Sequence, residues 1–122
     1  MNIDQAKQII LENSKAEGNS LVFYLHERGV LDTEGFWDFY DSIVTLVECT
    51  EEKTPEMTRL ITETYQRMLK YFMFHFDPGD EYKIENFPKD YIGYLERIEY
   101  ALMAYYSGNM RLVDEDIFEL KR

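Results

Sequence analysis

The chain has 122 residues, a length that suits one domain with its own core. Hydrophobic residues make up 45% of it and charged residues 30%, values that exclude an intrinsically disordered chain. The net charge of −11 disfavours direct contact with nucleic acid or anionic membranes, which need clustered Lys and Arg, and favours a basic protein partner.

Cysteine content and the first residues bear on the cellular compartment. Cys49 is the single cysteine, which excludes an internal disulfide and fits a reducing compartment. The first residues lack the basic and apolar pattern of a signal peptide, and no run reaches the ~18 apolar residues of a membrane span. We therefore expect a cytoplasmic protein.

Helical periodicity and end signals predict five helices with short connections. Their expected ranges are 3–17, 21–28, 33–49, 55–76 and 88–106. The expected N-terminal caps are Asn2, Ser20, Asp32 and Thr54, and the expected stops are Gly18, Gly29 and Gly108. In the connection 77–88, Tyr82 and Ile84 alternate with polar residues, which allows a short extended piece.

Residues 114–122 are expected to add one or two helical turns after a cap at Asp114. The whole chain, residues 1–122, is therefore predicted to be all-α. We expect a single-domain antiparallel bundle of about five helices, with room for a short C-terminal helix.

Apolar residues at helical spacing predict which face of each long helix enters the core. In 33–49 these are Phe36, Phe39, Tyr40, Ile43, Leu46 and Val47. In 55–76 they are Met57, Ile61, Tyr65, Met68, Leu69, Phe72 and Phe76. In 88–106 they are Tyr91, Ile92, Leu95, Ile98, Leu102, Met103 and Tyr106.

Helix 88–106 has two further features. Its opposite face carries Gly93, Arg97, Tyr100 and Ala104, where small residues leave room for the tail with Ile117, Phe118 and Leu120. Glu99 falls inside the predicted apolar arc, so its carboxylate needs a hydrogen bond, an ion pair or a raised pKa.

The most distinctive pattern is a stripe of charge on the predicted helix 33–49. Asp38, Asp41 and Glu48 lie on the side opposite the apolar arc, and residues 29–52 contain seven acidic residues and no Lys or Arg. Like charges at this spacing repel and cost stability. The stripe is either a face that meets Lys and Arg of a partner or a solvated helix face.

Aromatic side chains adjoin this stripe. Trp37 lies between the apolar and acidic sides, where it either anchors a partner or closes the edge of the core. Tyr40 is expected to add apolar anchoring. Residues 71–76 are apolar all round, so either the connection 77–88 covers them or they form a patch for self-association or for a partner.

Patterns that carry catalysis or metal binding are absent. The six glycines form no phosphate-binding loop, and no nucleophile elbow is present. Neither His26 nor His75 has Glu three residues before it, as a carboxylate-bridged metal bundle requires. We predict no catalytic residue, no cofactor and no metal site.

The chain resembles the small acidic helical immunity proteins that protect bacteria from a secreted toxin. The resemblance rests on Phe36-Trp37-Asp38-Phe39-Tyr40-Asp41 and Tyr91-Ile92-Gly93-Tyr94-Leu95-Glu96 and on the style of the whole chain, without a diagnostic motif. It implies a stoichiometric inhibitor that covers the active site of a basic toxin, commonly a nuclease, or a site beside it.

Three functions follow as hypotheses. In the first, an immunity or antitoxin protein occludes a basic toxin domain through Asp38, Asp41, Glu48, Trp37 and Tyr40. In the second, the chain is a structural or regulatory helical module that self-associates into a homo-oligomer. In the third, it is an acidic mimic of nucleic acid that occupies a nucleic-acid-binding protein.

Overall fold

The computed structural model describes all of residues 1–122, and its regular structure is entirely helical. The α-helices are α1 (Ile3–Lys15), α2 (Leu21–Phe23), α3 (Thr33–Leu46), α4 (Pro55–Phe76) and α5 (Tyr91–Ser107). Shorter turns are the π-helical η1 (Tyr24–Arg28) and the 3₁₀-helical η2 (Thr50–Glu52), η3 (Met110–Val113) and η4 (Glu115–Ile117). The predicted all-α bundle is confirmed.

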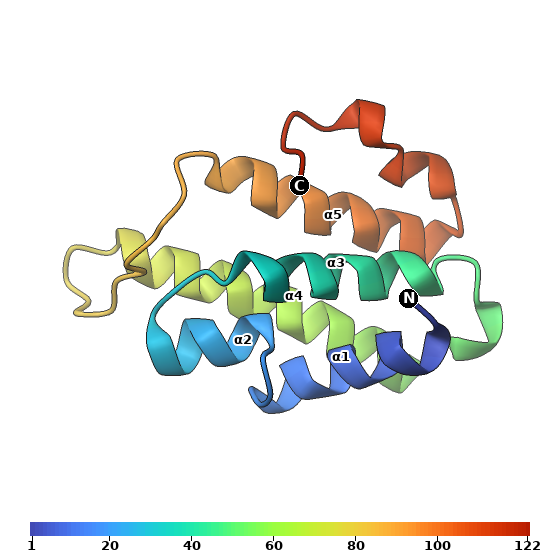
Figure 1. Cartoon of the computed structure of the whole chain (residues 1–122), viewed down its shortest axis with the longest axis horizontal. Helices are drawn as coiled ribbons and strands as arrows, with labels where there is room; N and C mark the ends of the chain where they lie inside the picture. Colours follow the sequence, from blue (N-terminus) through green and yellow to red (C-terminus); the bar gives the residue numbers. More distant parts are fainter.

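The four long helices form two antiparallel pairs. α1 and α4 run in one direction and α3 and α5 in the other, and the C-terminal tail folds back over α5 (Figure 1). α3 has the most extensive packing, against α1 on one side and α5 on the other. No helix combines the length and the apolarity that crossing a membrane would require.

Side-chain caps begin three of the long helices as predicted. Asn2 accepts from the backbone N–H of Gln5 at 2.8 Å, and Asp32 accepts from that of Gly35 at 2.8 Å. Thr54 accepts from the N–H of Met57 at 3.1 Å, and α4 has the predicted bounds. Each cap satisfies a backbone donor that has no partner within the helix.

Several element ends differ from the prediction. α1 ends at Lys15, because Ala16 already adopts the left-handed conformation with φ 52°. α3 ends at Leu46 rather than residue 49, because the N–H of Cys49 turns back to the carbonyl of Leu46. α5 begins at Tyr91, three residues after Pro88, and the connection before it contains no strand.

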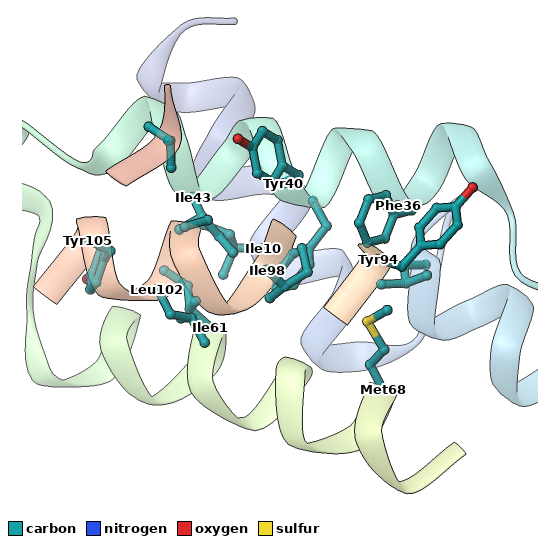
Figure 2. Close-up of a cluster of buried hydrophobic side chains, with 14 of the residues drawn as sticks. Ile10, Phe36, Tyr40, Ile43, Ile61, Met68, Tyr94, Ile98, Leu102 and Tyr105 are labelled. Carbon is teal, nitrogen blue, oxygen red and sulfur yellow. The ribbon is translucent and has the colours of Figure 1, made fainter. Parts of the chain in front are cut away.

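The core lies between the four long helices. Figure 2 shows buried side chains from α1, α3, α4 and α5 in one cluster, with Tyr40 at its edge. The predicted core residues of α3 are all buried, and Ile61, Met68 and Phe72 of α4 are buried with them. These faces follow the 3.6-residue period that the sequence shows.

The predicted core face of α5 is partly wrong. Ile92, Met103 and Tyr106 are exposed by 53%, 43% and 56%. The residues that α5 buries are Tyr94, Arg97, Ile98, Ala101, Leu102, Ala104 and Tyr105. Packing on two sides explains the rotation, since the bundle covers one face of α5 and the tail covers the small residues of another.

Candidate partner-binding face

The acidic residues singled out on α3 lie on its outer side. Asp38 is exposed and Asp41 is half-buried, and Glu48 is exposed in the turn that follows the helix. Phe36, on the opposite side of the helix, is buried in the core, so this face points outward. α3 is the helix with the most packing around it, so the face has a rigid support.

Long-range contacts compensate part of this acidic stretch. Arg122 places both Nη atoms on Asp41, at 2.6 and 2.8 Å, and Lys7 contacts Glu52 at 3.0 Å. Asp38 and Glu48 have no ion-pair partner. The stretch has no Lys or Arg of its own, and its counter-charges come from residues distant in the sequence.

The local field on this face is negative. Partial burial, and after it the neighbouring charges of Glu34, Asp41 and Asp32, raise the pKa of Asp38 above its ordinary value, while Arg122 opposes the rise. A carboxylate whose neighbours are carboxylates gains from an added cation. The face therefore favours Lys or Arg.

Trp37 is half-buried beside these carboxylates. Its ring makes edge contacts with Phe36 and Tyr40, with ring centres 5.0 and 5.5 Å apart. Two guanidinium groups lie near the ring, that of Arg97 at 5.0 Å and that of Arg122 at 4.7 Å. Trp37 thus closes the edge of the core and still reaches the surface.

Tyr40 is buried in the free protein. It is only 3% exposed, and its hydroxyl accepts a hydrogen bond from Nη1 of Arg97 at 3.1 Å. Its place in the predicted core arc is confirmed. The buried ring offers little surface to a partner, and its role as a partner anchor stays a prediction.

Arg97, on the face of α5 that receives the tail, is the residue around which this region is organised. Its side chain is fully buried and donates two hydrogen bonds to Glu115, at 2.5 and 3.0 Å, and two to the carbonyl of Leu120. Its guanidinium lies 4.1 Å from the centre of the Phe118 ring. The hydrogen bonds and charge of Arg97 hold the pKa of Glu115 below its ordinary value, despite some desolvation.

The face of α5 that was predicted to receive the tail does so. A Cβ on Gly93 would lie 3.0 Å from that of Leu120, and Tyr100 makes an edge contact with Phe118 at 5.5 Å. The tail arrives as two 3₁₀ turns instead of an α-helix, with Asp114 capping the second. The small residues Gly93 and Ala104 beside Tyr100 were the signal for this packing.

Glu99 does not lie in the core. Its side chain is exposed, so the predicted need for a buried partner was wrong. The carboxylate lies near Tyr65, whose pKa is raised by burial of the ring and then by this charge. No hydrogen bond joins the two side chains.

The aromatic end of α4 is covered only in part. His75 stacks on Phe87 with ring centres 4.0 Å apart, and its Nδ1 accepts from the N–H of Ile84 at 2.9 Å. The predicted cover by the connection is thus present over part of this segment. Met73, Phe74 and Phe76 nevertheless remain exposed by 67%, 41% and 50%.

Comparison with known protein families, characterised proteins and solved structures gives no significant match. The structure also brings together no group of three His, Cys, Asp or Glu residues placed to hold a metal ion. A hollow between the start of α5 and the tail is lined by apolar residues and by Asp90, Glu96 and Glu119, which adds to the acidic surface.

Proposed function

We propose that this protein acts by contact, as an immunity or antitoxin-type inhibitor that binds a basic protein stoichiometrically and occludes it. A bacterial toxin domain, for example a nuclease, is the partner we propose, and the cytoplasm is the compartment. The proposal gives no role to catalysis or to a cofactor.

One observation carries the proposal. Asp38 and Glu48 are exposed and have no ion-pair partner, and Asp38 follows the half-buried Trp37 in α3. Repulsion between the carboxylates of this face destabilises the free protein, and a basic surface of a partner would relieve that repulsion. Complementary charge of this kind raises association rates and sets partner choice.

A charge-reversal experiment tests this face. The double variant Asp38→Lys and Glu48→Lys leaves the Arg122 contact intact, unlike a reversal of Asp41. We expect the double variant to associate more slowly with the basic partner, once that partner has been isolated by pull-down. Its association should also depend less on salt, and stoichiometric inhibition should be lost.

The matched control reverses two exposed carboxylates elsewhere, Glu17→Lys and Glu81→Lys, with the same change in net charge. If both variants slow association equally, only the overall charge matters and the proposed face is wrong. If neither does, the partner binds elsewhere.

The exposed side chains at the end of α4 favour a second candidate function, a self-associating helical module. Met73, Phe74 and Phe76 are exposed there, Phe76 beside Phe87 and Tyr91 and Phe74 beside Tyr82. Sedimentation of the chain at increasing concentration decides between the two. A strict monomer at high concentration excludes self-association, and a dimer lost in Met73→Asp supports it.

A further inference from the structure

The contact between Arg122 and α3 has the two features by which proteins recognise arginine. Nη1 and Nη2 of Arg122 each donate to a different oxygen of Asp41, at 2.8 and 2.6 Å. The same guanidinium lies 4.7 Å from the centre of the Trp37 ring. A two-pronged carboxylate contact together with aromatic stacking suits the planar guanidinium group and does not suit an ammonium group.

This contact is held at the surface. The side chain of Arg122 is 49% exposed and that of Asp41 is 32% exposed, whereas Arg97 is fully buried. Exposed ion pairs add little to stability, because water and salt screen them and the side chains lose freedom. An arginine from another molecule can therefore replace Arg122 at small cost to the fold.

The surroundings keep the site attractive to a cation after Arg122 has paired with Asp41. Asp38 has no ion-pair partner, and Glu34 and Asp32 lie close enough to influence it. One guanidinium thus faces more than one carboxylate. A partner that brings an arginine with further positive charge gains more from this surface than Arg122 does.

We propose that Trp37 and Asp41 form an arginine-binding site that Arg122 occupies in the free protein and yields to an arginine of the partner. Arg122 thereby competes with the partner's arginine for this site. The inference rests on the proposed function for the identity of the partner, a basic protein, and adds which of its side chains is recognised.

Trp37 is the single tryptophan of the chain, so its indole N–H gives one resolved signal in a ¹H–¹⁵N spectrum. The probes are N-acetyl-arginine amide and, for comparison, N-acetyl-lysine amide, added to the full chain and to Arg122→Ala. We expect the arginine probe to shift the indole signal of Arg122→Ala at lower concentration than that of the unchanged chain. The lysine probe should shift it much less.

Two variants control this titration. Asp41→Asn in the Arg122→Ala background should abolish the response, and Arg59→Ala, which removes an exposed arginine elsewhere, should behave like the unchanged chain. An unchanged amide spectrum away from the tail shows that the variants fold. Equal responses to both probes, or a response that persists without Asp41, would overturn the inference.

The affinity for the partner is a second measurement of the site. Without the competing Arg122, the Arg122→Ala variant should bind the basic partner up to about five-fold more tightly, the upper end of the range expected for loss of one exposed ion pair. An arginine titration that succeeds while no basic partner is found contradicts only the proposed function. A partner that responds to Asp38→Lys and Glu48→Lys but not to Arg122→Ala contradicts only the arginine site.

Discussion

At the scale of single residues, Arg97 is the residue whose side chain donates the most hydrogen bonds. It is a buried charge whose donors are taken up by Glu115, Tyr40 and the carbonyl of Leu120. A buried charge is tolerated when every donor has an acceptor, and loss of one partner is costly. Arg97 therefore couples α3, α5 and the tail into one unit.

Replacing Arg97 by Ala should lower the free energy of unfolding by about 1.5 to 3 kcal/mol, because it removes the charge-assisted hydrogen bonds of a buried guanidinium to the exposed Glu115 and its contact with Phe118. Urea denaturation measures the change. Arg59→Ala is the control, since its pair with Glu63 is exposed and worth at most about 1 kcal/mol. Equal losses for the two variants would show that Arg97 is not a structural centre.

Asp38 differs from Arg97, because the negative charge of Asp38 is disfavoured in the folded chain. A carboxyl whose pKa is raised on folding destabilises the fold at any pH above that raised pKa. Asp38→Asn should therefore stabilise the protein at pH 7. The gain should shrink as the pH falls through the raised pKa toward the ordinary value of 3.8.

Urea midpoints at pH 7 and near pH 3.5 measure this difference. Glu81→Gln, a neutralisation in the exposed connection, is expected to change little at either pH. A loss of stability for Asp38→Asn at pH 7 would mean that the carboxylate contributes a favourable contact.

At the scale of elements, the connection between α4 and α5 is held by aromatic stacking and by one imidazole. Tyr82 donates its hydroxyl hydrogen to the carbonyl of Leu25 at 2.6 Å, and the N–H of Ile84 donates to His75. The acceptor role of Nδ1 requires neutral histidine. Desolvation, and after it the charge of Lys83, lower the pKa of His75, in keeping with that role.

This connection should loosen in mild acid. A histidine whose pKa is lowered on folding contributes stability above its ordinary pKa of 6.5 and loses that contribution as the pH falls through the lowered value. Hydrogen exchange of the Ile84 N–H, corrected for intrinsic rates, should show less protection at pH 5 than at pH 7.5.

His75→Phe is the matched variant, because it keeps a ring against Phe87 and removes the titrating acceptor. Its Ile84 N–H should be weakly protected at both pH values. Protection that does not depend on pH in the unchanged protein would show that the imidazole does not secure the connection.

At the scale of the whole molecule, charge repulsion opposes folding. The chain has 24 acidic and 13 basic residues, and few of them are joined in ion pairs. Excess charge of one sign destabilises the compact state by self-repulsion. Part of the acidic surface is therefore carried at a cost to stability.

Salt should stabilise this protein. Raising NaCl from 10 to 100 mM shortens the screening length from about 30 to about 10 Å, so the thermal midpoint should rise. KCl should act equally if screening is the cause, and sucrose at the same osmolality should not reproduce the ionic effect. A midpoint that falls with salt would mean that ion pairs outweigh the repulsion.

The candidate face shows which structural features local sequence patterns predict. The position of Asp38 on the outer side of α3 followed from helical spacing, and so did the burial of Tyr40. The exposure of Ile92 did not follow, because spacing shows that a helix has an apolar side without showing how much of it a neighbour covers. Roles as partner contacts stay predictions.

The sequence by itself determined the helices, their caps and the excess of negative charge, because periodicity and capping depend on residues three or four positions apart. Only the tertiary structure decided which charges are compensated. Arg122 meets Asp41 across 81 positions, and Arg97 meets Glu115 across 18. Such pairs form where the folded chain returns on itself, and no local spacing encodes that return.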